Sequence, residues 1–210
     1  MIQNPDARKY APATERNREV ILQVLLRILP PSGNVLEIAS GTGEHAVYFA
    51  PRLAPRNWIP TDPNPELRAS IAAWQAHLPS DNLKPPLNID ARSSVWEVEE
   101  KGMEIKAIAN INMIHISPWS ACLGLMAGAS RILPLGGILY LYGPFFQVEN
   151  NAPSNITFDQ SLRSQNPEWG VRNLDEVIEI AKNNGFNLQE TIPMPANNLS
   201  VIFNKLKSVV

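Results

Sequence analysis

The stretch that decides the fold covers residues 34–46 and reads NVLEIASGTGEHA. Its first half, Val35 to Ala39, has the apolar character of a buried strand, and Gly41 to Gly43 form a turn that opens a helix. Glycine lets the backbone turn tightly and approach a ligand, and the first turn of a helix leaves backbone N–H groups unpaired. Open α/β sheets bind nucleotides at such a junction. The stretch therefore predicts a nucleotide site without deciding which nucleotide it takes.

The composition predicts one cytoplasmic domain spanning residues 1–210. With 44% hydrophobic residues the chain can bury one sizeable core, and its net charge of −2 gives no nucleic-acid signal. The single cysteine, Cys122, excludes an intrachain disulfide and a multi-cysteine metal site, so no metal is expected. No apolar run approaches the roughly 20 residues that cross a bilayer. The polar N-terminus is unlike a signal peptide.

Strands and helices alternate along most of the chain. A polar arm, residues 1–13, precedes a helix from about Thr14, its expected cap, to Leu29. Asn64 is expected to cap a later helix. This alternation predicts a parallel sheet with helices on both faces. The expected strands are 35–39, 58–61, 87–89, 105–109 and 138–142.

The end of the chain breaks the alternation. Asn173 with Glu176 forms a capping-box pattern for a helix that closes near Gly185. Two strand-like runs, 186–192 and 199–204, follow with no room for a crossover helix between them, so they should pair as an antiparallel hairpin. The predicted fold is a Rossmann-like, mostly parallel sheet of seven strands that ends in this hairpin.

Two features favour S-adenosylmethionine over NAD as the ligand. The string GTGEHA and Asp62, about 20 residues further on, fit the fingerprint of either cofactor. Glu37, however, lies inside a buried strand and needs a partner, which the ammonium of a bound methionine moiety would supply. The terminal hairpin is also a feature of methyltransferase sheets that the dinucleotide domain lacks. NAD-dependent oxidation remains an alternative, although no Tyr-x-x-x-Lys pair supports its short-chain form.

The acid-x-x-x-G-x-G pattern, the acids that close strands two and three, and the hairpin resemble class I S-adenosylmethionine-dependent methyltransferases across essentially the whole chain. More narrowly, several blocks resemble, in order, the methyltransferase-like twenty-six family. These blocks are ATERNREVIL, LEIASGTGEHAVYFA, DPNPELRASI, NINMIHISPW, GPF and FDQSLRSQNPEWGVRNLDEV. The sequence departs from the general pattern at Ala39 and Ser40, where a glycine is more usual.

The resemblance implies a set of contacts with S-adenosylmethionine, whose product is S-adenosylhomocysteine. Asp62 would accept hydrogen bonds from the ribose, and Asp90 with Ala91 would border the adenine. Asn110 and Met113 would face the sulfonium. The methionine part would lie among Glu37, Ala39, Gly41 and Gly43.

The loop 110–119 lies beside the methyl group in this fold. It lacks the Asn/Asp-Pro-Pro-aromatic pattern of enzymes that methylate planar nitrogens, which favours a small-molecule acceptor. His115 is the candidate general base, because its reference pKa is near neutrality. Its alternative role is a hydrogen bond to backbone at a helix entry. Tyr142 is the second catalytic candidate, with a packed core aromatic as its alternative.

The long segment 144–172 is expected to be a lid loop. Its Arg163, Trp169 and Arg172 are candidates for binding an anionic or planar acceptor, although the arginines could equally satisfy carbonyls and carboxylates. Tyr10 and Asn17, near the N-terminus, are candidates for covering the cofactor and substrate. Because no familiar catalytic loop is present, a non-catalytic cofactor-binding scaffold or regulator is the main alternative function.

Overall fold

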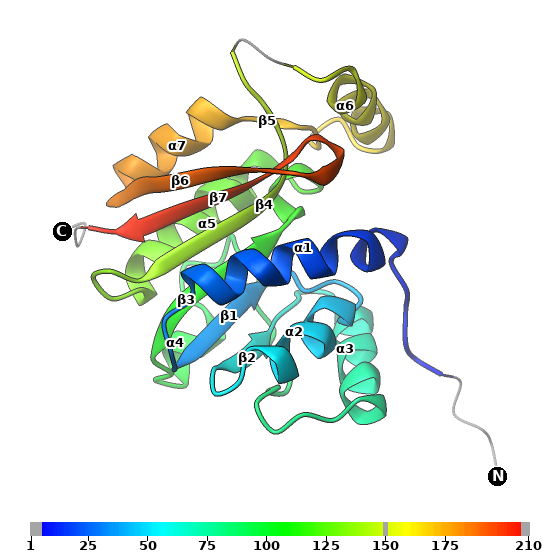
Figure 1. The fold of residues 1–210 in the computed structure, drawn as a ribbon, viewed down its shortest axis with the longest axis vertical. Coiled ribbons are helices and arrows are strands. Elements are labelled where there is room, and N and C mark those ends of the chain that lie inside the picture. Colours follow the sequence, from blue (N-terminus) through cyan, green and yellow to red (C-terminus); the bar gives the residue numbers. More distant parts are fainter. Residues whose placement is uncertain (1–5, 149–150, 207–210) are drawn as a thin grey trace.

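The strands of the computed structural model, which describes residues 6–148 and 151–206, form one mixed sheet in the order β2-β1-β3-β4-β7-β6, with β5 beside β4 (Figure 1). The strands are β1 (Asn34–Ile38), β2 (Asn57–Pro60), β3 (Ile105–Ile111), β4 (Ile138–Phe146), β5 (Arg172–Asn173), β6 (Phe186–Met194) and β7 (Asn198–Lys205). The α-helices are α1 (Pro12–Ile28), α2 (Glu44–Arg52), α3 (Pro65–His77), α4 (Glu97–Glu100), α5 (Trp119–Ile132), α6 (Pro153–Gln165) and α7 (Leu174–Asn183). Two 3₁₀ turns, η1 (Met113–His115) and η2 (Pro195–Asn197), complete the set.

The predicted Rossmann-like sheet with a terminal hairpin is confirmed. Strands β2, β1, β3 and β4 are parallel, and β7 runs antiparallel between β4 and β6. Because β2, β1, β3 and β4 run in the same direction, their carboxyl ends share one edge of the sheet. The glycine turn that follows β1 lies at that edge.

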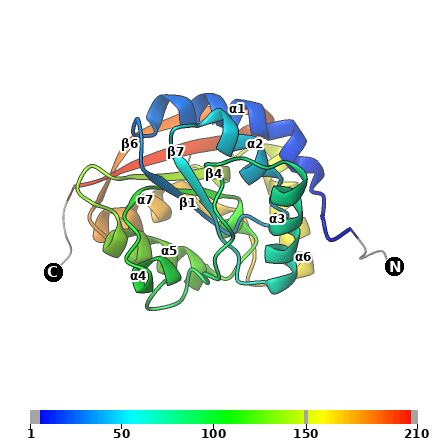
Figure 2. The ribbon, with the colours of Figure 1, turned by 90° about the horizontal axis from the view of Figure 1, so that it is seen from below.

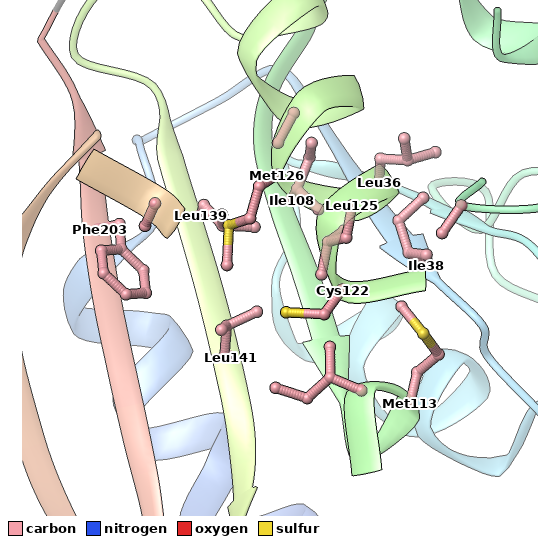
Figure 3. Packing of buried hydrophobic residues seen from close by; sticks show 14 of the residues in the cluster. Leu36, Ile38, Ile108, Met113, Cys122, Leu125, Met126, Leu139, Leu141 and Phe203 are labelled. Carbon is pink, nitrogen blue, oxygen red and sulfur yellow. The ribbon is translucent and has the colours of Figure 1, made fainter. Parts of the chain in front are cut away.

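Helices cover both faces of the sheet, α1 and α2 on one and α4, α5 and α7 on the other (Figure 2). Alternate residues of β4 divide between these two cores, because successive side chains of a strand point to opposite faces. Leu139 and Leu141 pack with Cys122 of α5 (Figure 3), whereas Tyr140 and Tyr142 face α1 and α2. None of the described helices is long and apolar enough to cross a membrane.

The helix starts agree with the sequence where an asparagine side chain is free to cap. Asn64 accepts a hydrogen bond from the backbone N of Glu66, and Asn173 accepts from the backbone N of Asp175 at 2.8 Å. The expected cap at Thr14 is wrong: α1 begins at Pro12, whose fixed φ suits a first helical position, and Thr14 is buried within the first turn.

Two segments differ from their predictions. Residues 83–87 join β2 only through isolated bridges, Trp58 to Leu83 and Thr61 to Leu87, instead of forming a strand at 87–89. The prolines at 85 and 86 explain this, because they have no N–H to donate to a ladder. The described part of 144–172 is not a loop, since β4 continues to Phe146 and α6 occupies 153–165. Residues 149–150, and residues 1–5 of the expected arm, lie outside the described ranges.

Candidate functional site

The two glycines of the turn adopt left-handed backbone conformations for different reasons. Gly41 has φ of 58° and open space where a Cβ would lie, so that side of the turn is free to meet a ligand. Gly43 has φ of 92°, and a Cβ there would lie 2.8 Å from the Cα of Ile71 in α3. Gly43 therefore allows α3 to pack against the start of α2, while Gly41 leaves the backbone accessible.

The backbone conformation of Ala39 explains why a glycine is more usual at this position. Its φ of 58° is left-handed, which costs a non-glycine residue roughly 1–2 kcal/mol. The next residue, Ser40, donates its backbone N–H to the carbonyl of Thr61 and accepts the Thr61 N–H on its hydroxyl. These bonds tie the end of β1 to the end of β2 and hold the strained residue in place.

Glu37 is a buried carboxylate just before the turn. It is 1% exposed, and its Oε2 accepts a hydrogen bond from Nε1 of Trp58 at 2.9 Å. Burial raises the pKa of Glu37 to about 7, against the hydrogen bonds from Trp58 and Ser40, and nearby Asp62 raises the pKa further. Within the described ranges no lysine, arginine or histidine forms an ion pair with it.

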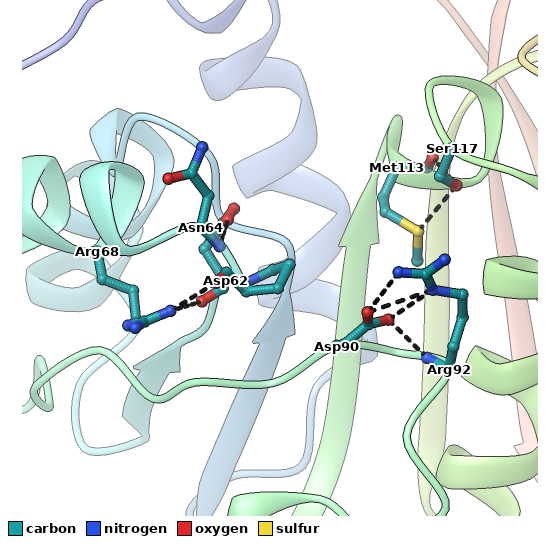
Figure 4. Close-up of polar contacts among 8 residues, drawn as sticks. Asp62, Asn64, Arg68, Asp90, Arg92, Met113 and Ser117 are labelled. Carbon is teal, nitrogen blue, oxygen red and sulfur yellow. Dashed lines mark hydrogen bonds and ion pairs between the residues drawn. The ribbon is translucent and has the colours of Figure 1, made fainter.

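Asp62 lies two residues after the end of β2, beside Asn64 and Arg68 (Figure 4). Its carboxylate accepts from the backbone N of Gly41 at 3.1 Å and of Asn64 at 2.9 Å. Burial raises the pKa of Asp62, against these two hydrogen bonds and the charge of Arg68. Asp62 therefore connects the glycine turn to the start of α3.

Asp90 forms an ion pair with Arg92, with Nη2 and Oδ2 2.6 Å apart (Figure 4). Hydrogen bonds from Arg92 lower the pKa of Asp90. The neighbouring Ala91 is buried, and its carbonyl lies against Gly124 of α5, where a Cβ would approach it to 2.4 Å. Asp90 is thus the more accessible of the two residues that were expected to border an adenine.

Asn110 and Met113 lie at the carboxyl end of β3 and in the turn after it. The Asn110 amide donates to the carbonyl of Ile38 at 2.9 Å, and its buried Oδ1 has no hydrogen-bond partner among the described residues. The Ser117 hydroxyl lies 3.3 Å from the sulfur of Met113 (Figure 4). The unpaired Oδ1 of Asn110 is an acceptor next to the end of β1.

His115 is fully buried and does not line the cavity described below. Its Nδ1 accepts the backbone N–H of Arg172 at 3.3 Å, and its ring meets Phe145 edge-on with centroids 4.9 Å apart. Burial lowers the pKa of His115 to about 3. Gly143 encloses it further, since a Cβ there would lie 2.5 Å from Nε2. In this arrangement protein groups enclose the His115 ring, and His115 is not among the described residues that line the cavity.

Two of the three candidates from the 144–172 segment bind protein groups, and the third does not line the cavity described below. Arg172 donates to the carbonyls of Ile114 and Ser117, at 2.8 and 2.7 Å. Arg163 pairs with Asp159 at 2.8 Å, and Trp169, half-buried, is not among the residues that line the cavity. The two arginines thus satisfy carbonyls and a carboxylate of the protein, which is the alternative role that the sequence allowed them.

Residues 9–11 attach the N-terminal arm to the glycine turn. Glu44 Oε2 accepts hydrogen bonds from the backbone N of Ala11 and from the Thr42 hydroxyl. Ser70 accepts from the backbone N of Lys9 and donates to the carbonyl of Thr42. Tyr10 itself is 64% exposed, with its ring edge-on to Trp74, so it lies over α3.

A cavity of about 560 Å³ lies between α1, η1, β4, α6 and the turn of the terminal hairpin. It brings together Asn17 and Tyr142, two candidates that are 125 positions apart in the chain. Sequence reasoning missed most of its other residues, because they meet only in the folded chain; the left-handed φ of Asn112, 63°, is visible only in the structure. The lining residues are Ala13, Arg16, Asn17, Val20, Asn112, Ile116, Tyr142, Pro144, Ser154, Asn155, Phe158, Pro195, Ala196 and Asn198.

Several solved structures with a similar fold are methyltransferases. The S-adenosylmethionine-dependent methyltransferase SibL, in its apo form, is 14% identical, with a TM-score of 0.75 over 93% of this chain and 56% of SibL. Human N-acetylserotonin methyltransferase in complex with SAM is 13% identical, with a TM-score of 0.75 over 93% of this chain and 53% of that protein. An O-methyltransferase family 2 protein from Planctomyces limnophilus, in complex with apigenin, is 20% identical, with a TM-score of 0.70 over 91% and 62%.

These likenesses define the fold as that of S-adenosylmethionine-dependent methyltransferases. The chain spans little more than half of the length of the solved proteins that it matches, from 53% to 62% in these three. More particularly, the chain belongs to the family described as "Protein of unknown function (DUF938)", which matches residues 8–205.

Proposed function

We propose that the chain binds S-adenosylmethionine and transfers its methyl group to a small molecule. The observation that carries the proposal is Glu37, a carboxylate that is buried near the end of β1, accepts a hydrogen bond from Trp58 and forms no ion pair within the described ranges. A buried carboxylate without a counter-charge is costly, and such a group favours a cationic ligand. The ammonium of a methionine moiety, bound directly or through water, would supply that charge.

Other groups around the turn fit the same cofactor. Gly41 leaves space beside the backbone, and the unpaired Oδ1 of Asn110 can accept a hydrogen bond from a ligand. In this proposal Ala39 and Gly43 shape the turn around the methionine part and Met113 borders the sulfonium. Asp62 accepts from the ribose hydroxyls, and Asp90 with Ala91 borders the adenine. The cofactor would supply a methyl carbon open to in-line attack, and the chain's own residues hold it in place.

The sequence also supports narrower proposals. The blocks that resemble the methyltransferase-like twenty-six family recur in order, which supports a relation to that family. The single cysteine supports a reducing, cytoplasmic location, and we propose one domain whose 144–172 segment borders the acceptor.

Calorimetric titration with S-adenosylhomocysteine and, separately, NAD tests the cofactor. We expect S-adenosylhomocysteine to bind and NAD not to bind. Asp62→Ala should weaken S-adenosylhomocysteine about tenfold or more, because it removes hydrogen bonds to a charged acceptor. Asp81→Ala, which removes an exposed carboxylate, is the matched control. The unfolding midpoint of each variant separates a lost ligand contact from a loosened turn. Binding of NAD alone would overturn the proposal.

A non-catalytic, cofactor-binding role is the second candidate. It is favoured by the burial of His115, which leaves the described lining of the cavity without a basic side chain that titrates near neutral pH. This role predicts S-adenosylhomocysteine binding with no methylated product from any acceptor. Incubation with radiolabelled S-adenosylmethionine and fractionated small-molecule pools distinguishes the two roles.

A further inference from the structure

The side chains around the cavity carry a single formal charge. Among its described lining residues, Arg16 is charged and none is Asp, Glu, His, Lys or Cys. Arg16 is exposed on α1 and forms no ion pair within the described ranges. Much of the remaining wall is apolar, with Val20, Ile116 and Phe158 among its members. Such a cavity is complementary to an apolar molecule that carries at most one negative charge.

A buried hydrogen bond sets the direction of one polar group in the wall. Buried His45 and Asn17 meet through Nε2 and Oδ1 at 2.8 Å. Burial lowers the pKa of His45 to about 3, so the ring is neutral and its Nε2–H donates to the amide oxygen. The Asn17 amide N–H groups therefore point away from His45, and Asn17 lines the cavity together with Tyr142.

The Tyr142 hydroxyl is a donor in the cavity wall. Burial raises the pKa of Tyr142, more than the nearby Asn17 side chain lowers it, so the phenol keeps its proton at neutral pH. Because the phenol is protonated and lines the cavity, its O–H can donate to a group inside. Arg16 and Tyr142 thus both present donors, and neither can accept a proton from an acceptor at neutral pH.

We propose that the acceptor of this cavity is an apolar small molecule that is already an anion at neutral pH, such as a carboxylate, a thiolate or an acidic phenolate. This inference rests on the proposed function and names the substrate class for its site. A lone pair of the acceptor anion forms the new bond to the methyl carbon, and the electrons of the broken sulfur–carbon bond return to sulfur. No proton leaves in this step, so no general base is required. Asn17 acts as a positioning residue for Tyr142.

Three probes of similar shape and different charge test the inference. Benzoate, benzyl alcohol and benzylamine are titrated into the protein by calorimetry at pH 7.5, with and without saturating S-adenosylhomocysteine. We expect benzoate to bind at least about tenfold more tightly than the neutral or cationic probe. Tyr142→Phe should weaken benzoate about tenfold, and Arg16→Gln about threefold because that charge is exposed and screened. Arg27→Gln, on the same helix outside the cavity, should leave it unchanged.

Each outcome of these titrations bears on one proposal. Benzylamine or benzyl alcohol binding as tightly as benzoate would overturn the anion inference. A wild-type protein that does not bind benzoate would also overturn it, and so would two variants that bind benzoate as tightly as wild type does. If the ligand-free protein binds benzoate but does not bind S-adenosylhomocysteine, the result counts against the proposed function alone. Asn17→Ala adds a readout specific to positioning: its effect on benzoate should disappear in a Tyr142→Phe background.

Discussion

Glu37→Gln should stabilise the ligand-free protein at alkaline pH. Glutamine keeps the shape of the side chain and an oxygen that can accept from Nε1 of Trp58, but it removes the buried charge. The pKa of Glu37 rises from 4.5 to about 7 on folding, because burial disfavours the carboxylate. The folded protein therefore holds this proton more tightly than the unfolded chain does, and the stability of wild type falls as pH rises from about 4.5 through about 7.

The size of the effect follows from that difference in pKa. At about 1.4 kcal/mol for each pH unit, the ionised carboxylate costs about 3 kcal/mol above pH 8 and less than about 1 kcal/mol at pH 5. Urea denaturation of wild type and Glu37→Gln at pH 5.0, 7.0 and 8.5 measures it. The free energies of unfolding should differ little at pH 5.0 and by about 3 kcal/mol at pH 8.5.

Glu104→Gln, at a side chain that is 83% exposed, is the matched control and should show no such growth with pH. A constant difference between wild type and Glu37→Gln across the three pH values would refute the reasoning. The same substitution should weaken S-adenosylhomocysteine binding. A variant that is more stable and binds the cofactor less well would identify a carboxylate kept for a ligand.

Two further predictions concern the turn and the core. Gly43→Ala should cost about 3 kcal/mol, from left-handed strain and overpacking against Ile71, whereas Gly41→Ala should cost about 1 kcal/mol because its Cβ meets open space. Equal losses in urea denaturation would contradict this account. Burial raises the pKa of Cys122 to about 12, so the thiol should react with Ellman's reagent only after unfolding, and rapid labelling of the native protein would show that α5 opens readily.

The order and class of the elements could be predicted because each depends on short-range pattern. Buried parallel strands read as apolar runs, and asparagine caps at 64 and 173 are local devices. The misses are also local in origin. Two consecutive prolines reduced the expected strand at 87–89 to bridges, and a proline at position 153 opens a helix inside the segment that was expected to be a loop.

Some features of the candidate site could likewise be predicted from local sequence, whereas others depend on residues that are distant in the chain. The left-handed turn at Gly41 and Gly43 follows from residue type, and the burial of Glu37 follows from its strand. The surroundings of His115 do not, because the residues that enclose it, Phe145 and Arg172, lie 30 and 57 positions further along the chain. The cavity is likewise assembled from five separate elements, so Arg16 carried no local signal of its place in the wall.

The hydrogen bond between the Ala11 amide and Glu44 makes the N-terminal arm a natural reporter on the glycine turn. Glu44 holds Ala11 and Thr42 through the same oxygen, so any rearrangement of the turn alters the protection of the Ala11 amide. Deuterium uptake at that one amide would follow the binding and release of the proposed cofactor, without a label placed in the site.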